Sequence, residues 1–507
     1  MKDFHTDALT VGIAGTGAMG RGIAQIAVQG GAQVLLYDAM DGAAQKAKDY
    51  ISGMLAKLGE KGKLTPEQVS SANARLTVAS TVEALAPCDL VVEAIIENLA
   101  IKKEFFLKLE AVTREDAILA TNTSSLSVTS IAAACKRPER VAGYHFFNPV
   151  PLMRIVEVVA GARTNPAVCD ALTVLAKRMG HTAVTAQDTP GFIVNHAGRG
   201  YGTEALRILG EGVAEFHQID RIMTDAAGFR LGPFELLDLT GLDVSHPVME
   251  SIYRQYYEEP KYKPSVIGQL RKDAGLLGRK TGRGFYNHAD GKQEVFPDAP
   301  APAKPDIPVW VSRAYPQGHA AATDLLAQLG VPCESGSVPT GDALIVVTPL
   351  GTDATNAALD QGLDPTRTVA LDTLLPLVKR RTLMVTPVTR PEFRAAAHGL
   401  FAADGVPVTV TRDSAGFVAQ RILAMIVNVG CDIVQQRVCS PSDLDLAVTL
   451  GLSYPKGPLA FGDALGAQKV LTILRNINQL TGDPRYRPSP WLRRRGAIGL
   501  SLLHEES

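Results

Sequence analysis

His145 and Glu157 are the residues whose types and surroundings best suit acid–base chemistry. His145 ends the apolar run of GYHFFNP, and Glu157 lies twelve residues later inside the apolar run IVEVV. A carboxylate in such a run is costly unless it has a partner, and an imidazole, which titrates near working pH, suits a general base. We predict that Glu157 orients the His145 ring and stabilises its protonated form, as removal of a hydroxyl proton requires. A core histidine beside an unrelated glutamate is the alternative interpretation.

A glycine-rich turn at residues 15–20, GTGAMG, fits the dinucleotide-binding pattern GxGxxG. It follows a strand-like run and opens a helix-like run, which is the context that gives this pattern weight. Gly15 permits the tight turn, Gly17 lets the backbone approach the pyrophosphate, and Gly20 lets helix and strand pack closely, while the helix N-terminus attracts the phosphates. A turn in a fold that binds nothing is the alternative. The predicted cofactor contacts here are Gly15, Gly17, Ala18, Met19 and Gly20.

Asp38 ends the next strand-like run, at the spacing expected of the acidic residue that binds the adenosine ribose. Its charge repels a 2′-phosphate, and no arginine follows it in Ala39-Met40-Asp41. The sequence therefore favours NAD over NADP. An aspartate that caps a helix or a turn is the alternative.

Ser124 and Asn195 are further candidates, for binding a substrate oxygen. Ser124 follows a strand-like run, and open α/β sheets bind ligands beyond the carboxyl ends of their strands, although capping of the following helix explains Ser124 equally well. Asn195 follows a Pro-Gly-Phe turn on an apolar helix, where a polar amide needs a partner. We expect no metal site, and none of the six cysteines forms a CxxC pair.

The elements that would position these residues form a doubly wound α/β domain. Continuously apolar, β-branched runs alternate with helix-like runs, which suits a parallel sheet covered on both faces. Strands are expected at 11–14, 33–37, 90–95, 117–120, 140–144 and 155–159, and helices at 18–30 and 41–74.

Four further regions follow this domain. Helical patterns dominate two of them, a second α/β pattern lies between, and five prolines indicate a linker. Further helices are expected at 192–209 and 218–227, and further strands at 309–311, 344–348, 368–371 and 383–386. The predicted regions are a Rossmann-type domain at 1–187, a helical domain at 188–291, the Pro-rich linker at 292–308, a degenerate Rossmann-like region at 309–412 and a second helical domain at 413–507.

The two helical domains are related by an internal duplication. DTPGFIVN, which begins at Asp188, matches DSAGFVAQ, which begins at Asp413. The difference in residue number between these two aspartates is the duplication spacing, and it holds without a gap as far as Gly241 and Gly466. In the second copy Gln420 replaces Asn195, the first strand runs into the bulky turn SRAYPQG, and LMVTPVTRPE at 383–392 offers threonine in place of the catalytic histidine. We predict that this half keeps the fold without NAD binding or catalysis.

Composition excludes several classes of protein. The 507 residues are 46% apolar and 20% charged, which argues against disorder. Lys and Arg number 51 against 52 Asp and Glu, so the basic footprint of a general nucleic-acid binder is absent. No apolar run is long enough to span a membrane, no signal peptide is evident, and the scattered cysteines fit a reducing cytoplasm.

The chain resembles the L-3-hydroxyacyl-CoA dehydrogenases of fatty-acid and related acyl-CoA catabolism. The family's motifs keep their order and spacing over residues 9–287, and the resemblance implies reversible, NAD-dependent oxidation of an L-3-hydroxyacyl-CoA to the 3-ketoacyl-CoA. The motifs are GTGAMGRGIAQ (15–25), DLVVEAIIENL (89–99), TNTSSL (121–126), HFFNPVP (145–151), DTPGFIVN (188–195), LGPFELLDLTGLD (231–243) and GRKTGRGFY (278–286).

The resemblance also implies roles for residues. It makes His145 the general base and Glu157 its partner, and it has Ser124 and Asn195 bind the hydroxyl or carbonyl oxygen of the substrate. Lysines of a helical arm meet the phosphate of coenzyme A in this family; a solvated helix face explains them equally well here. The implied cofactor contacts are Glu97, Lys102 and Asn122, and the implied coenzyme A contacts are Lys57 and Lys61.

The long form with a degenerate second copy resembles bacterial enzymes that act on 3-hydroxyadipyl-CoA in phenylacetate degradation, with 3-hydroxybutyryl-CoA as the rival substrate. We expect the tethered second helical domain to pack on the first and imitate a dimer within one chain; further self-association to a homo-oligomer is left open. A dehydrogenase of a free hydroxy or sugar acid is one alternative function. A non-catalytic dinucleotide-binding structural protein is another.

Overall fold

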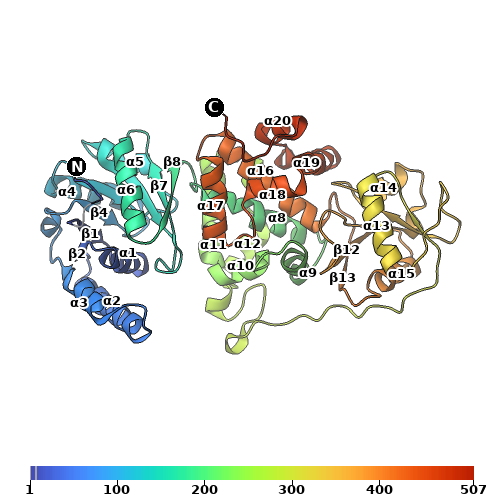
Figure 1. The fold of residues 1–507 in the computed structure, drawn as a ribbon, viewed down its shortest axis with the longest axis horizontal. Helices are drawn as coiled ribbons and strands as arrows, with labels where there is room; N and C mark the ends of the chain where they lie inside the picture. Colours follow the sequence, from blue (N-terminus) through green and yellow to red (C-terminus); the bar gives the residue numbers. More distant parts are fainter. Residues whose placement is uncertain (1, 6–7, 507) are drawn as a thin grey trace. The chain divides into compact units, whose positions relative to one another are not determined.

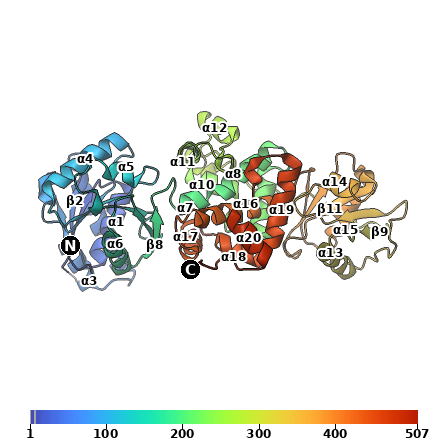
Figure 2. The same cartoon turned by 90° about the horizontal axis from the view of Figure 1, so that it is seen from above.

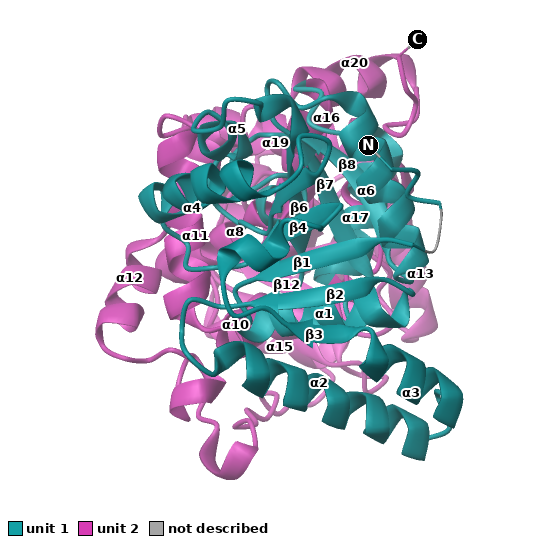
Figure 3. Ribbon diagram, turned by 90° about the vertical axis from the view of Figure 1, so that its left-hand side faces the viewer, with its two compact units in different colours: residues 1–196, 436–452 teal, residues 197–435, 453–507 magenta. Residues whose placement is uncertain are grey.

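The computed structural model describes residues 2–5 and 8–506, whose helices and strands are labelled in Figure 1 and in the turned view of Figure 2. The residues fall into two compact units that are interleaved in sequence (Figure 3). The first unit is Met1–His196 with Gln436–Leu452, and the second is Ala197–Gln435 with Ser453–Ser507. The predicted domains follow one another along the chain. They do not include the grouping of a short segment of the second helical region, Gln436–Leu452, with the first unit.

An eight-stranded sheet forms the centre of the first unit. Its strands are Thr10–Ala14 (β1), Gln33–Tyr37 (β2), Leu76–Val78 (β3), Leu90–Glu93 (β4), Ile118–Thr121 (β5), Val141–Phe146 (β6), Ile155–Ala160 (β7) and Thr182–Gln187 (β8). They lie in the order β3-β2-β1-β4-β5-β6-β7-β8, and all neighbours are parallel except β6 and β7. The sheet is therefore mixed rather than wholly parallel, because the hairpin that follows β6 reverses the chain.

Helices cover both faces of this sheet. One apolar cluster packs α1, α2 and α6 on one face, and another packs α4 and α5 on the opposite face. Two strands of this sheet were not predicted, because β3 has only three residues and β8, TAVTAQ, is too polar to form a continuous apolar run. The helices are Ala18–Gln29 (α1), Ala43–Glu60 (α2), Pro66–Ala74 (α3), Leu99–Val112 (α4), Val128–Ala132 (α5), Pro166–Arg178 (α6) and Pro441–Leu452 (α17).

The second unit contains helices from both copies. The helix predicted at 192–209 is divided at Gly198 into two, and the one predicted at 218–227 begins earlier and ends in a π-helical turn at Ile222–Ala226. The helices are Val194–Ala197 (α7), Arg199–Gly210 (α8), Phe216–Arg221 (α9), Pro233–Thr240 (α10), Leu242–Gln255 (α11), Val266–Asp273 (α12), Val418–Gln435 (α16), Pro458–Leu465 (α18), Ala467–Thr481 (α19) and Pro490–Ile498 (α20), with α7 leading into the unit.

The second unit also holds a five-stranded sheet. Its elements are Val309–Val311 (β9), Pro316–Gln328 (α13), Leu344–Val347 (β10), Ala354–Leu359 (α14), Thr368–Leu371 (β11), Arg381–Val385 (β12), Pro391–Phe401 (α15) and Val408–Thr411 (β13). The order is β13-β12-β11-β10-β9, and only β11 and β12 pair antiparallel. This succession repeats that of β4 to β8, so β9 stands in the place of β4.

That correspondence bears on the prediction that the second copy binds no dinucleotide. Bulky residues after β9 were expected to block a glycine-type turn. Beyond β9, where the first sheet has three further strands, the described part of the second half has only an isolated parallel bridge between Val309 and Cys333, which α13 connects. The βαβ arrangement that follows β9 is thus reduced to a strand, a helix and one bridge, and the loss of NAD binding in this half stays a prediction.

α8 and α16 pack together at equivalent positions of the two copies. A β-carbon added at Gly200 would lie 2.8 Å from Ile426 Cα and 3.0 Å from Met425 O, so a glycine is needed for this close approach. Gly200 and Met425 are themselves separated by the duplication spacing, as expected of a contact close to an approximate twofold axis. α16 is long and apolar enough to cross a membrane, but 89% of it is buried, because α8, α18, α19 and α20 pack around it.

A buried carboxylate joins α8 to the second copy. Glu204 Oε1 accepts hydrogen bonds from Arg421 Nε (2.9 Å) and Tyr486 OH (2.7 Å), and Oε2 accepts one from Arg485 Nε (2.7 Å). Burial alone would raise the pKa of Glu204, but the two guanidinium charges and these hydrogen bonds lower it to about 2. The carboxylate thus neutralises two buried cations, of which Arg421 also pairs with Glu211.

Glu204→Ala is expected to lower the free energy of unfolding by about 3–5 kcal/mol, because it leaves the buried guanidinium of Arg485 without a carboxylate and leaves Arg421 with Glu211 alone. Acid should weaken the wild type for the same reason. The folded pKa lies below the unfolded value of about 4.3, so the stabilisation is present above about pH 5 and is lost as the pH falls towards 2. Urea unfolding measures both effects. Glu259→Ala, which removes a pair with the exposed Arg487, is the control; a loss as large as that of Glu204→Ala would contradict this account.

Candidate active site

The glycines of the turn between β1 and α1 have two different roles. Gly15 has a φ of 89°, and a β-carbon added at Gly20 would lie 1.8 Å from Gly15 O. A β-carbon added at Gly17 would meet no atom within 4 Å. Gly15 and Gly20 are therefore demanded by the local backbone, whereas Gly17 borders open space. The residues fit a pyrophosphate, which would fill that space.

A cavity of about 520 Å³ opens beside this turn. At its rim Asp38 Oδ2 accepts hydrogen bonds from Thr16 N (2.7 Å) and Thr16 Oγ1 (2.8 Å), and Oδ1 accepts one from Met40 N (3.0 Å). Burial alone would raise the pKa of Asp38, but these bonds lower it, so the carboxylate is charged and suits ribose hydroxyls. The cavity is also lined by Tyr37, Ile95, Ile96, Ile101 and Phe105.

A network of charges lies at the carboxyl end of β4, with Glu93 and Lys102 buried and Glu97 exposed. Lys102 Nζ is 2.5 Å from Glu93 Oε1 and 3.3 Å from Glu97 Oε2. Glu97 Oε1 in turn accepts hydrogen bonds from Ser124 N and from the hydroxyls of Thr123 and Ser125. Desolvation alone would raise the pKa of Glu97, but the Lys102 ammonium and these bonds lower it. The network therefore fixes the loop that carries Ser124.

Glu93 is the site residue that sequence reasoning missed. It is completely buried and accepts hydrogen bonds from Lys102 and from Thr121 Oγ1. It lies inside the apolar run LVVE. A carboxylate in an apolar strand is the same signal that singled out Glu157, and applied evenly it would have found Glu93.

His145 and Glu157 face each other on β6 and β7, where the antiparallel register pairs them directly. Both are buried, and His145 Nδ1 lies 2.5 Å from Glu157 Oε2. Glu157 Oε1 accepts hydrogen bonds from Ile193 N and Val194 N, each 2.9 Å long. The carboxylate thus ties the imidazole to the start of α7. With Nδ1 engaged, proton exchange with a ligand falls to Nε2.

The remaining predicted side chains lie around this pair. Asn195 follows Val194, and its Nδ2 approaches Ser124 O at 3.4 Å. Asn122 Oδ1 accepts a hydrogen bond from Phe146 N, which fixes the chain beside His145. The first unit therefore brings Ser124, His145, Glu157 and Asn195 together near the carboxyl ends of β5 and β6.

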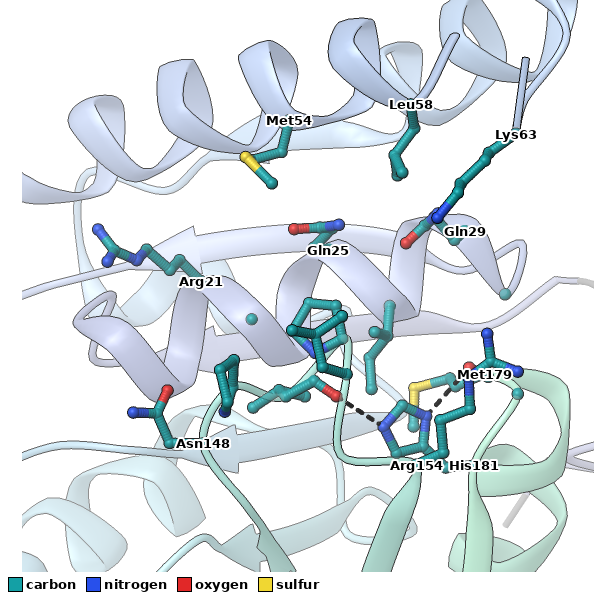
Figure 4. A pocket seen from close by; sticks show the side chains of 18 of the residues that line it. Arg21, Gln25, Gln29, Met54, Leu58, Lys63, Asn148, Arg154, Met179 and His181 are labelled. Atoms are coloured by element: carbon teal, nitrogen blue, oxygen red, sulfur yellow. Dashed lines mark hydrogen bonds between the residues drawn. The ribbon is translucent and has the colours of Figure 1, made fainter. Parts of the chain in front are cut away.

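A second cavity, of about 710 Å³, lies between α1, α2 and the segment that follows β6 (Figure 4). Lys57 and Lys61 were predicted to bind coenzyme A, but both are exposed and neither lines this cavity. α2 ends at Glu60, and the turn after it brings Lys63 to the cavity instead, where its side chain reaches towards Gln29 (Figure 4). Apolar Met54 and Leu58 share the lining with the cations Arg21, Lys63, Arg154 and Arg178.

The second sheet contains a remnant of the site. Strand register places Asp372 where the first copy has His145, and Thr382 where it has Glu157. The prediction of a threonine within 383–392 as the counterpart of His145 is therefore wrong, because that stretch begins inside β12, the counterpart of β7.

The remnant has different groups at the positions of His145, Glu157 and Asn195. Gln420, which replaces Asn195, donates from Nε2 to Asp372 Oδ1 (2.9 Å) and to Pro349 O (3.1 Å). Burial raises the pKa of Asp372 to about 6. Within the described residues the hydrogen-bond partners of this carboxyl are the Gln420 amide and Leu374 N, and they include neither an imidazole nor a second carboxylate.

Family models match both halves of the chain. The model described as 3-hydroxyacyl-CoA dehydrogenase, NAD binding domain, matches residues 10–189. The model described as 3-hydroxyacyl-CoA dehydrogenase, C-terminal domain, matches residues 191–288 and residues 416–501. The starts of the two C-terminal matches are separated by the duplication spacing, in agreement with an internal repeat.

Some known proteins resemble nearly the whole chain, and others resemble about half of it. It is 37% identical to 3-hydroxyadipyl-CoA dehydrogenase of Escherichia coli (strain K12), over 96% of this chain and 98% of the relative. It is 40% identical to the mitochondrial hydroxyacyl-coenzyme A dehydrogenase of Homo sapiens, over 55% of this chain and 90% of the relative. The crystal structure of 3-hydroxybutyryl-CoA dehydrogenase from Escherichia coli K12 substr. MG1655 aligns with a TM-score of 0.85 at 36% identity, covering 97% of this chain and 98% of that one.

His145→Gln is expected to lower kcat for alcohol oxidation by about 100-fold or more, since general-base catalysis contributes about 10²–10⁴. NAD affinity should be unchanged, because His145 does not line the cavity beside the glycine turn. Stopped-flow measurement of NADH formation and a binding titration with NADH check the two halves of this prediction. A near-normal kcat would remove His145 from the role of base.

Gly17→Val should fold like the wild type yet bind NAD about tenfold or more weakly, a cost of about 1.4 kcal/mol, because its side chain would occupy the open space. Gly20→Val is the matched control and should lower Tm instead, because its side chain collides with backbone. Calorimetric titration with NAD and thermal unfolding separate the two effects. Normal NAD affinity in Gly17→Val would show that the pyrophosphate lies elsewhere.

Proposed function

This chain belongs to the 3-hydroxyacyl-CoA dehydrogenase family, and on that premise we propose that it oxidises 3-hydroxyadipyl-CoA to the 3-ketoacyl-CoA. Its N-terminal domain binds NAD. The observation that carries the proposal is the buried pair of His145 and Glu157, held 2.5 Å apart in the same unit as the glycine turn. An imidazole in this setting is a base positioned to accept a proton from a hydroxyl.

The residues of the chain divide the work of the reaction. When bound, NAD supplies the nicotinamide ring that accepts hydride from C3 of the substrate. His145 takes the hydroxyl proton, while Glu157 keeps the ring in place through Nδ1 and stabilises its positive charge. Asn195 and Ser124 bind the substrate oxygen and stabilise the charge that it gains. Glu97, Lys102 and Asn122 remain the proposed cofactor contacts on this side of the site.

The cavity beside α2 supports a coenzyme A thioester as the substrate class. Its lining combines cations, which suit phosphates, with apolar side chains, which suit a base and a pantetheine chain. Arg21 lies over the Tyr50 ring at 4.1 Å, so this cation is held at the wall of the cavity. A free hydroxy or sugar acid would leave such a cavity unused, and a non-catalytic protein would not need the intact set around His145.

The full-length relatives give two names for the acyl chain. The relative that is 37% identical is named for 3-hydroxyadipyl-CoA, and the structure that aligns over 97% of the chain is named for 3-hydroxybutyryl-CoA. We favour 3-hydroxyadipyl-CoA and a role in phenylacetate degradation. 3-Hydroxybutyryl-CoA is the second candidate.

The second helical copy takes, in this proposal, the place that a dimer partner would occupy. The contact of α8 with α16 near Gly200 supports this, because it joins equivalent positions of two related domains. The six free cysteines support a reducing compartment, and we propose the cytoplasm.

A panel of substrates decides among these candidates. NADH formation is measured with L- and D-3-hydroxybutyryl-CoA, L-3-hydroxyadipyl-CoA and the free 3-hydroxy acids. We expect turnover of the L-thioesters, with the highest kcat/KM for the adipyl compound. Turnover of the free acids alone would refute the assignment to coenzyme A thioesters.

Lys63→Ala is expected to raise KM for the preferred thioester about fivefold, which corresponds to about 1 kcal/mol for one phosphate contact, with kcat unchanged. Lys57→Ala, on the exposed face of α2, is the matched control and should leave KM as it is. The N-acetylcysteamine thioester of the same acyl group lacks the nucleotide, so its KM should not respond to Lys63→Ala. An equal response of both thioesters would place the nucleotide outside this cavity.

A further inference from the structure

The second helical copy reaches the catalytic strands of the first α/β domain. Val438 O accepts a hydrogen bond from Gln187 N at 2.8 Å, so this backbone pairs with the end of β8. Asp443 Oδ2 accepts hydrogen bonds from Thr185 Oγ1 (3.0 Å) and Thr185 N (3.3 Å). α17 packs against β7 and β8. Because β7 carries Glu157, the helix lies against the strand that holds the catalytic carboxylate.

α17 also reaches the turn that supplies Glu157 with hydrogen bonds. A β-carbon added at Gly451 would lie 3.0 and 3.1 Å from the two γ-carbons of Val194. Val194 N donates to Glu157 Oε1, and Asn195 is the next residue. Cys439 lies half-buried nearby: desolvation raises the pKa of its thiol, and the charges of Asp443 and Glu157 raise it further. Residues 436–452, which belong to the second copy, therefore contact both the strand that carries Glu157 and the turn that donates hydrogen bonds to it.

The same contact occurs in reverse within the second unit. Arg412 N donates to Val213 O at 3.0 Å. The duplication spacing relates Arg412 to Gln187, and it relates Val438 to Val213. Each helical copy thus pairs with the last strand of the other copy's sheet. The sheet that Val213 contacts carries only the remnant with Asp372. Of the two contacts, therefore, only that of Val438 with Gln187 lies in the sheet that carries His145 and Glu157.

We propose that residues 436–452 of the second copy form a positioning element of the active site, and that Gly451 is the positioning residue through which α17 sets Glu157 and Asn195. This inference rests on the proposed function. The two backbone donors of Glu157 belong to the turn that α17 contacts. A side chain at position 451 pushes that turn, lengthens those hydrogen bonds and shifts both Glu157 and Asn195.

Gly451→Val in the full chain is expected to lower kcat about tenfold or more, since a displacement of about 1 Å costs up to about 100-fold in rate, and to leave the Kd for NAD unchanged. Gly451→Ala should give a smaller loss, although alanine is the better helix former. Thr449→Val places a valine on the exposed side of the same helix and is the matched control. Adding Val194→Ala to Gly451→Val should recover kcat, because it removes the γ-carbons that collide.

An unchanged kcat in a folded Gly451→Val variant would overturn the proposal, and so would a loss that Val194→Ala does not relieve. If Gly451→Val does not fold, the milder Gly451→Ala, alone and with Val194→Ala, gives the same decision. Wild-type turnover in this assay tests the proposed function by itself. If the wild type is inactive, hydrogen–deuterium exchange over residues 189–195 still decides: faster exchange in Gly451→Val than in Thr449→Val supports the positioning role, and equal exchange refutes it.

Discussion

The geometry of the site depends on how one buried carboxylate, that of Glu157, is satisfied. Burial of a carboxylate is costly unless its oxygens have hydrogen-bond partners, and both oxygens of Glu157 have them. One oxygen is hydrogen-bonded to the imidazole of His145, and the other accepts from the N–H groups of Ile193, just before α7, and of Val194, its first residue. The turn before α7 accepts unusual backbone to make this fit, since Gly191 and Phe192 both have positive φ, 78° and 48°. β6, β7 and α7 are thereby fixed to one another around a single side chain.

The second copy shows which contacts the fold keeps where His145 and Glu157 have no equivalents. Asp188 accepts hydrogen bonds from the start of α5, and Asp413 does the same for α14. This link between the helical turn and the sheet is retained. Glu157 and His145, in contrast, have become Thr382 and Asp372. A carboxylate that caps a helix stabilises any version of the domain, whereas a buried carboxylate that serves an imidazole is useful only where that imidazole acts.

The parts of the fold that could be predicted are those that depend on local pattern. The strand at 33–37 was predicted to the residue, and the pairing of His145 with Glu157 followed from polar residues in apolar runs. Long-range arrangement could not be read in this way. The identity of Asp372 as a counterpart depends on strand register, and the presence of Lys63 rather than Lys57 at the cavity depends on where a helix ends. The grouping of 436–452 with the first unit depends on packing between segments far apart in the chain.

The interleaving of the two units also bears on synthesis of the protein by the ribosome. The first unit is unfinished when His196 emerges, because residues 436–452 belong to it and the whole of 197–435 comes between. At about 5–20 residues per second, synthesis of that intervening stretch lasts roughly 12–48 s. During this time α17 does not yet cover the outer edge of β8 and the turn at Val194. The nascent first half therefore leaves this edge and this turn uncovered until α17 has been made, and the first unit is completed only after the second copy has been translated that far.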